Sequence, residues 1–313
     1  MKILLGLLVA FALATPLIAT WREARFRAAF PPIGDFIAVD GLQVHYVMAG
    51  SGPDLVLIHG SSGNLRDFTF SLVSKLKDHY RVIVFDRPGL GYSDALPDGL
   101  IFNQAEHLHK AAVALGVKDA IVLGHSYGGP VAISWALNHP EDTAALVTLA
   151  APTRPWDTPL GTYYTATSSR LGQYALVPIL TAYVPTSLAR GALAALFANG
   201  QAPSGLTEYY GAELALQRDV MRANASQRAT LLAEVTELSR HYAEIKVPWE
   251  ALHGTADDVV SADFHMPTLL VAAPTAKATL LPGAGHMIEF EAEDAVITAI
   301  GRAAARAGLR AHP

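Results

Sequence analysis

The chain has 313 residues, of which 51% are hydrophobic and 16% charged, and its formal net charge is −5. This length suits one large α/β domain with an insertion or two small domains, and the apolar fraction excludes a disordered chain. Lysine and arginine are scattered and form no basic stripe, so nucleic acid is not an expected partner. The absence of cysteine excludes disulfides, thiolate metal sites and cysteine nucleophiles.

Residues 1–30 differ from the rest of the chain. Lys2 precedes an apolar run over residues 3–19, and three arginines follow within residues 22–27. Lys2 and a candidate cleavage site at Ala12-Leu13-Ala14 are typical of a cleaved secretory signal. The apolar run, however, continues past that site and is followed by arginines, which is typical of a retained membrane anchor. A buried core helix is a third interpretation. We expect a secreted or periplasmic protein, or one that associates with a membrane through residues 3–19.

Strand signals begin at Phe36. The Asp40-Gly41 pair between two β-type segments predicts a hairpin. Four short runs that are apolar on both faces follow, and such runs are typical of a buried parallel sheet; they cover residues 54–60, 81–86, 120–124 and 145–150. Helical patterns alternate with these runs, which predicts right-handed βαβ units; they cover residues 68–78, 103–116 and 129–140.

The alternation stops after Pro152. The next residues are rich in Ala, Leu and Tyr, contain several prolines and have no comparable strand run, which predicts a helical cap. Strand patterns return at residues 247–254 and 277–286, and a helical pattern closes the chain. The predicted organisation has three parts. Residues 1–30 form an N-terminal segment, residues 31–152 and 246–313 form the α/β core, and residues 153–245 form the inserted cap.

The segment Gly124-His125-Ser126-Tyr127-Gly128 matches G-x-S-x-G between a predicted strand and a predicted helix. In that context a tight turn holds the serine in a strained backbone conformation, and small neighbours allow the close approach of the chain. Ser126 is therefore the candidate nucleophile. A glycine-rich turn in which the serine only caps the helix is the structural alternative.

A serine nucleophile needs a base and an orienting acid, in the chain order Ser, acid, His. His286 follows the last predicted strand, where catalytic loops of parallel sheets lie, and is the candidate base. The preceding strand leads into Asp257 and Asp258, of which only one can face the imidazole. Weaker candidates are His253 and His265 for the base and Asp157 for the acid. His107 and His109 are two apart on a predicted helix and form no metal pair.

Backbone amides must face the oxygen that becomes negative during acyl transfer. One donor is expected to be the amide of Tyr127, the residue after the nucleophile. The second should come from the loop His59-Gly60-Ser61-Ser62-Gly63, and we assign it to Ser61, with Ser62 as the alternative. A plain strand-exit turn is the other interpretation of this loop.

With these residues placed, the chain resembles the α/β-hydrolase superfamily, and within it the capped branch that holds esterases, perhydrolases, C–C bond hydrolases, epoxide hydrolases and haloalkane dehalogenases. The matching stretches are "LVLIHGSSGN", "RVIVFDRPGLGYSD", "IVLGHSYGGPVAISWALNHPE", "HGTADDVV" and "LPGAGHM". The resemblance implies a mostly parallel central sheet flanked by helices, with a cap over the site. The family places its acid at the end of G-x-x-D, here Gly254 to Asp257, which favours Asp257 over Asp258.

Epoxide hydrolases and dehalogenases of this branch use an aspartate nucleophile, so the resemblance with Ser126 implies acyl transfer through an acyl-enzyme. No metal or organic cofactor is needed. Cap tyrosines among Ala and Leu suggest an apolar or aromatic acyl group, although cap packing explains them equally. The prediction is a small-molecule ester hydrolase; a C–C bond hydrolase of aromatic meta-cleavage products, a cofactor-free perhydrolase and a non-enzymatic binding protein are the alternatives. The sequence carries no signal of oligomeric state.

Overall fold

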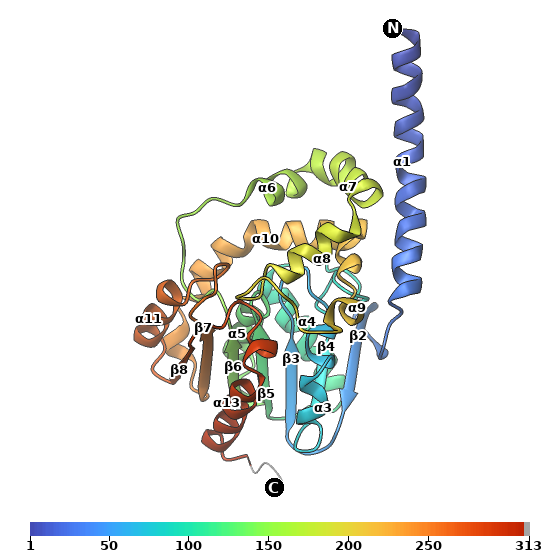
Figure 1. Ribbon diagram of the computed structural model, residues 1–313. Helices are drawn as coiled ribbons and strands as arrows, with labels where there is room; N and C mark the ends of the chain where they lie inside the picture. Colours follow the sequence, from blue (N-terminus) through green and yellow to red (C-terminus); the bar gives the residue numbers. More distant parts are fainter. Residues whose placement is uncertain (310–313) are drawn as a thin grey trace.

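The computed structural model describes residues 1–309 and has one eight-stranded sheet at its centre, in the order β1-β2-β4-β3-β5-β6-β7-β8 (Figure 1). The two pairings that involve β2 are antiparallel and all the others are parallel, as the sequence predicts. The strands are Asp35–Val39 (β1), Leu42–Ala49 (β2), Asp54–Ile58 (β3), Arg81–Phe85 (β4), Ala120–His125 (β5), Thr143–Leu149 (β6), Trp249–Gly254 (β7) and Ala276–Leu281 (β8). Asp40 and Gly41 both have positive φ, as the predicted hairpin turn requires.

Two helical layers bury the two faces of this sheet. In β3, Leu55 and Leu57 point into one hydrophobic cluster, whereas Val56 and Ile58 point into the other, because successive side chains of a strand alternate. The first cluster includes residues of α3 and α13 and the second includes residues of α4, α5 and α11. The core helices are Arg66–Thr69 (α2), Leu72–Leu76 (α3), Ile101–Ala114 (α4), Gly128–Asn138 (α5), Ala262–Ala272 (α11), Ile288–Glu291 (α12) and Glu293–Arg306 (α13).

Two predicted elements differ from the structure, and one observed helix was not predicted. The helix expected over residues 68–78 is two short helices, α2 and α3, separated near Phe70. Helix α11 was not predicted, and Pro267 inside it interrupts the helical pattern of the sequence. The last strand ends at Leu281 rather than at His286, so His286 lies on the loop that follows this strand.

The chain between β6 and β7 is helical, and its helices lie above one end of the sheet (Figure 1). We call this segment the cap; its limits as a separate domain stay a prediction. Helix α10, the longest of the set, contacts α4 and α5 of the core. The cap helices are Thr162–Ser168 (α6), Val177–Tyr183 (α7), Thr186–Ala194 (α8), Leu206–Tyr210 (α9) and Arg218–Leu238 (α10).

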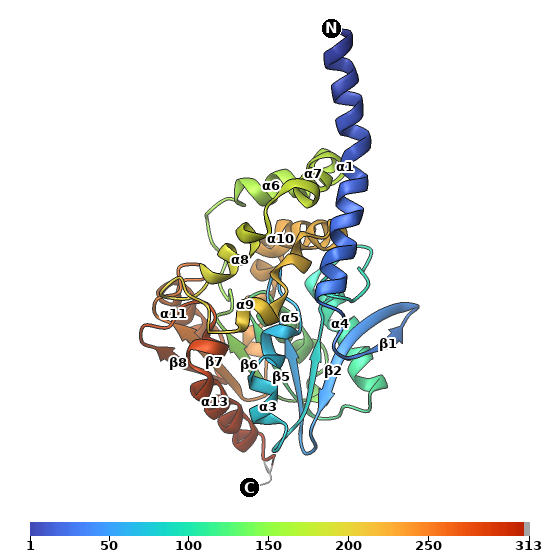
Figure 2. The same cartoon turned by 45° about the vertical axis from the view of Figure 1, so that its right-hand side comes forward.

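The N-terminal segment is one helix, Lys2–Ala29 (α1), which runs beside the cap and continues past it (Figure 2). Among residues 1–309 it is the one helix that is by itself long and apolar enough to cross a membrane, with a mean hydropathy of 2.4 over an 18-residue window. Signal sequences have the same property, so the helix fits either predicted role. Its side chains before Phe11 are all exposed, which excludes a buried core helix.

Candidate active site

Ser126 lies at a sharp turn between β5 and α5. Its φ of 50° is in the left-handed region, which a side chain adopts at a cost of about 1–3 kcal/mol. A Cβ atom on Gly128 would lie 2.2 Å from the carbonyl oxygen of Ile58, and one on Gly124 would lie 2.0 Å from that of Gly128. The two glycines of the motif are therefore required by close backbone contacts, which supports an elbow rather than a simple helix cap.

His286 and Asp257 meet Ser126 from two distant loops. The Ser126 Oγ atom lies 2.9 Å from Nε2 of His286, and Nδ1 of His286 lies 2.8 Å from Oδ2 of Asp257. Because an ionised carboxylate only accepts hydrogen bonds, Nδ1 carries the proton and Nε2 accepts the hydroxyl proton of the serine. All three side chains are at least nine-tenths buried. The structure thus brings together the three residues that the sequence singles out.

The Asp257 carboxylate is held ionised by its surroundings. Its Oδ1 accepts hydrogen bonds from the amides of Val259 and Val260, each at 2.8 Å. Burial raises the pKa of Asp257, but hydrogen bonds from His253, His286 and the Val260 amide outweigh burial and hold this pKa well below its usual value. The neighbouring Asp258 is exposed and lacks these contacts.

The loop after β3 lies directly against the serine. A Cβ atom on Gly60 would be 3.0 Å from Cβ of Ser126. The Ser62 amide donates to Oδ1 of Asn224 on α10 at 3.0 Å, so it is already engaged. In the part of the chain that the structure describes, the amides of Ser61 and Tyr127 have no hydrogen-bond partner. This difference favours Ser61 over Ser62 as the candidate oxyanion donor.

Arg87 braces this loop and is a residue that sequence reasoning missed. Its fully buried guanidinium donates to the carbonyl oxygens of His59, at 2.9 Å, and Gly60, at 3.1 Å. The same group lies 4.3 Å from the centre of the Tyr127 ring, a favourable cation–π geometry. Arg87 therefore ties the loop at His59 and Gly60 to Tyr127, the residue after the candidate nucleophile. Arg87 lies in the stretch "FDRPG", and nothing in that stretch alone indicates the role of the arginine.

The weaker candidates occupy other positions. His253 donates through Nε2 to the Val260 carbonyl at 2.6 Å and lies 3.3 Å from Oδ2 of Asp257, so it supports the acid. His265 accepts the amides of Thr153 and Arg154 through Nδ1. Asp157 is exposed. Residues 1–309 contain no group of three or more His, Asp or Glu side chains placed to hold a metal ion.

Two buried carboxyl groups near the site, Asp67 and Glu289, form no ion pair with Lys or Arg among the described residues, although the charge of Arg87 acts on Asp67. Burial raises the pKa of Asp67 to about 7 and raises that of Glu289 well above its usual value. Burial lowers the pKa of His125 to about 3, so its ring is neutral. Its Nε2 donates to the His286 carbonyl at 3.0 Å, which leaves Nδ1, 3.3 Å from the Glu289 carboxyl, as an acceptor. Neither this Nδ1 atom nor the Glu289 carboxyl oxygens have a hydrogen-bond partner among the described residues.

We expect Glu289→Gln to stabilise the protein increasingly as the pH rises. The pKa of Glu289 in the folded protein lies above its value of about 4.5 in the unfolded chain. Above pH 4.5 the folded protein therefore keeps a proton on this carboxyl group that the unfolded chain has released. This lowers stability by up to about 1.4 kcal/mol per pH unit, until the folded group also ionises. Glutamine removes this dependence because its side chain does not ionise. Urea unfolding at pH 5 and pH 8, with exposed Glu141→Gln as the control, measures the effect; an equal difference at both pH values contradicts it.

The profile of the Alpha/beta hydrolase family matches residues 55–299. The chain belongs to this family. Over 108 residues it is 38% identical to a pimeloyl-[acyl-carrier protein] methyl ester esterase of Vibrio vulnificus, in an alignment that covers 34% of this chain and 40% of that protein. The matched part is thus well under half of either protein.

Solved structures of this family share the fold across nearly the whole chain. A membrane phospholipase A, described as a bacterial virulence factor, superposes with a TM-score of 0.66 at 22% identity, covering 97% of this chain and 99% of that one. A meta-cleavage product hydrolase gives 0.70 at 21% identity, covering 87% and 98%. These likenesses and the profile match confirm the predicted fold. The relatives of this chain include hydrolases, among them the methyl ester esterase.

Proposed function

We propose that the chain is a serine hydrolase that cleaves carboxylic esters through an acyl-enzyme on Ser126. The observation that carries this proposal is the hydrogen-bonded series from Ser126 Oγ to His286 Nε2, at 2.9 Å, and from His286 Nδ1 to Asp257 Oδ2, at 2.8 Å. This is the geometry that a hydroxyl nucleophile, its base and an orienting acid require.

In the proposed reaction, His286 takes the Ser126 proton as Oγ bonds to the ester carbonyl carbon. The carbonyl oxygen becomes negative and accepts hydrogen bonds from the Ser61 and Tyr127 amides. Asp257 stabilises the imidazolium, which then protonates the departing alcohol oxygen. Water, deprotonated by His286, attacks the acyl carbon, releases the carboxylic acid and restores the serine hydroxyl.

C–C bond hydrolysis is a second candidate, favoured by the structural likeness to a meta-cleavage product hydrolase. The same triad would then act on a carbonyl carbon whose leaving group is carbon rather than oxygen. A perhydrolase, in which peroxide replaces water in the second step, needs no other residue. Tyr163, Tyr174 and Tyr183 of the cap are exposed on its surface, so the suggestion of an apolar or aromatic acyl group does not rest on these three residues.

We also propose that α1 holds the enzyme at a membrane. Its length and hydropathy allow this, and the likeness to a membrane phospholipase A extends over 97% of the chain, which takes in most of α1. The arginines at its C-terminal end are typical of a retained anchor. A phospholipid is accordingly one ester class to be tested.

Fluorophosphonate labelling tests the mechanism, because this reagent phosphonylates an activated serine. We expect one adduct, on the peptide that contains Ser126, and its loss when His286 is replaced by alanine. A panel of p-nitrophenyl esters, phospholipids and a dienoate meta-cleavage product then ranks the substrate classes. Labelling elsewhere, or no labelling with retained ester turnover, would refute Ser126 as the nucleophile.

A further inference from the structure

The outer part of the cap is almost free of charged residues. Between residues 158 and 207 the only charged side chains are Arg170 and Arg190, whereas about one residue in four is charged in typical soluble domains. The segments Gly172–Tyr183 and Thr186–Ala194 together are apolar enough for a membrane span, although they are bent by 93°. This composition is unusual for helices that have no further layer of protein outside them.

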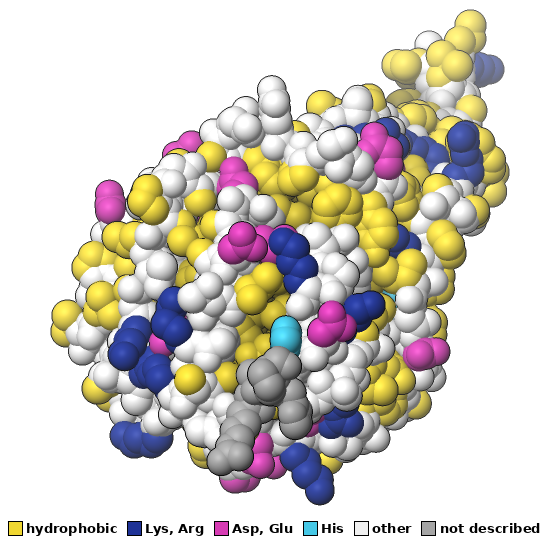
Figure 3. Space-filling view, turned by 60° about the horizontal axis from the view of Figure 1, so that its bottom comes forward, with side chains coloured by type: hydrophobic (Ala, Val, Ile, Leu, Met, Phe, Trp, Pro, Cys, Tyr) yellow, Lys and Arg dark blue, Asp and Glu magenta, His cyan; other side chains and the backbone are white. Residues whose placement is uncertain are grey.

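Large apolar and aromatic side chains are exposed on these helices. Leu171 is 78% exposed and Tyr174 is 72% exposed. We call the set the apolar cap face; it consists of Tyr163, Leu171, Tyr174, Tyr183 and Leu188. The opposite end of the molecule differs, because acidic and basic side chains are dispersed over it (Figure 3). A concentrated apolar surface of this kind marks an interaction site.

The apolar cap face is continuous with the apolar helix α1. The Phe11 ring stacks on the Tyr183 ring with centroids 5.5 Å apart, and Thr15 Oγ1 lies 3.2 Å from the Tyr183 hydroxyl. Arg22 donates to the Val184 carbonyl at 2.6 Å. Helix α7 therefore lies beside the second half of the apolar run of α1, and only the residues before Phe11 extend beyond it (Figure 2).

This contact fixes the position of the cap relative to any membrane that α1 enters. The ten residues before Phe11 are about 15 Å long at 1.5 Å per residue, whereas a hydrocarbon core is about 30 Å thick. If α1 spans the core, α7 enters the same layer beside it. If only those ten residues insert, they reach about half-way across the hydrocarbon core, and α7 then lies at the boundary between the lipid and the water. Both depths bring the apolar cap face to lipid.

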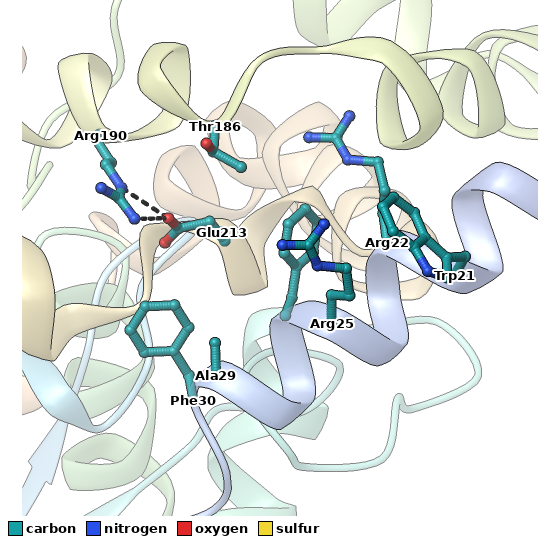
Figure 4. Close-up of a pocket in the computed structure, with 9 residues that line it drawn as sticks. Trp21, Arg22, Arg25, Ala29, Phe30, Thr186, Arg190 and Glu213 are labelled. Carbon is teal, nitrogen blue, oxygen red and sulfur yellow. Dashed lines mark hydrogen bonds and ion pairs between the residues drawn. The ribbon is translucent and has the colours of Figure 1, made fainter.

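Basic and aromatic residues mark the level at which α1 leaves the apolar layer. Trp21, Arg22 and Arg25 line a hollow of about 380 Å³ between α1 and the cap, and Arg190 of α8 lies across from them (Figure 4). Arg25 is six residues past Ala19, about 9 Å along the axis, which is close to the depth of lipid headgroups. Among the described residues, Arg22 and Arg25 form no ion pair; Arg22 uses one donor on the Val184 carbonyl, and its remaining donors and those of Arg25 can meet lipid phosphates.

We propose that the apolar cap face is a bilayer-contact surface, continuous with α1, through which the enzyme takes its ester substrate from lipid. The proposal rests on the membrane role of α1 proposed above, but not on the chemistry of Ser126. It explains why the outer cap is apolar and nearly uncharged where a soluble cap would be charged. Ser126 is only 9% exposed, and cap residues contact the loops around it: the Leu196 carbonyl accepts the His286 amide, and Asn224 accepts the Ser62 amide.

The absence of native cysteine allows single-site labelling of the full-length protein. A fluorophore is attached to Leu171→Cys or Tyr174→Cys on the cap and to Leu8→Cys on α1. Val271→Cys, at an equally exposed apolar residue of α11, is the matched control. Each protein is reconstituted in phosphatidylcholine–phosphatidylglycerol vesicles that contain a lipid-attached quencher, and iodide serves as the aqueous quencher. We expect both cap labels to be quenched by the lipid reagent and shielded from iodide, and the Val271 label to show the reverse.

The label on α1 separates the possible failures. If Leu8 is in lipid while both cap labels are in water, the cap proposal is wrong and the anchor stands. If Leu8 is also in water, the anchor itself is refuted, whatever the esterase assay shows. Cap labels that are shielded from both quenchers would mean that a second copy of the chain covers this face, which also overturns the proposal.

A double variant gives a functional readout. Leu171→Asp with Tyr174→Asp should lower hydrolysis of an ester embedded in vesicles several-fold, without changing hydrolysis of a soluble p-nitrophenyl ester. Val271→Asp should change neither rate. Equal loss on both substrates would indicate damage to the fold instead of the surface, and no loss on vesicles would contradict the proposal.

Discussion

Replacing Ser126 by alanine should lower kcat/KM for p-nitrophenyl esters by about 10⁴-fold or more, because the acyl-enzyme can no longer form. The Oγ atom that lies 2.9 Å from His286 Nε2 is the one atom removed. The residual rate would come from the oxyanion donors and substrate binding alone. Steady-state kinetics with a chromogenic ester, together with the fluorophosphonate adduct, measures the loss.

Ser134→Ala is the matched control for this experiment. Ser134 is a second buried serine, on α5 directly after the elbow, and its hydroxyl oxygen lies 3.3 Å from the Asn138 side chain. Its removal deletes one buried hydroxyl from the same helix but leaves the His286 contact intact. We expect activity to stay within a few-fold of the parent. An active Ser126→Ala protein would mean that another residue is the nucleophile.

The sequence predicted the sheet and the elbow because both depend on local patterns. Runs that are apolar on both faces identify buried parallel strands. Glycine is required at positions 124 and 128 because a Cβ atom there would lie 2.0 and 2.2 Å from backbone oxygens. The order of Ser126, Asp257 and His286 along the chain also follows from the family pattern. Their meeting at hydrogen-bonding distance was expected for that reason.

Features that depend on contacts between distant segments were not predicted. The buried Arg87 links the loop at Gly60 to Tyr127, and no spacing in the sequence reveals that bridge. The same holds for Glu289, whose burial beside His125 is set by packing around the site. The stacking of Phe11 on Tyr183 fixes α1 against the cap, and the apolar run of α1 alone does not reveal this contact.

Replacing Asp257 by asparagine should lower kcat by about 10³–10⁴-fold with little effect on the fold. Asparagine can still accept the Val259 and Val260 amides that Oδ1 accepts now, so the loop keeps its shape. Its amide group, however, can donate to Nδ1 of His286. The imidazole proton would then move to Nε2, the atom that has to accept the proton of Ser126.

Stability adds a second readout for the same substitution. The pKa of Asp257 is held below its usual value, so the ionised side chain stabilises the fold above about pH 4, and this contribution is lost as the pH falls through the folded pKa. The difference in melting temperature between the parent and Asp257→Asn should therefore be larger at pH 7 than at pH 3. Asp258→Asn, an exposed neighbour, should change neither activity nor this difference. If Asp258→Asn is inactive and Asp257→Asn is active, the acid has been assigned to the wrong residue, because the contact at 2.8 Å would then have no role in orienting His286.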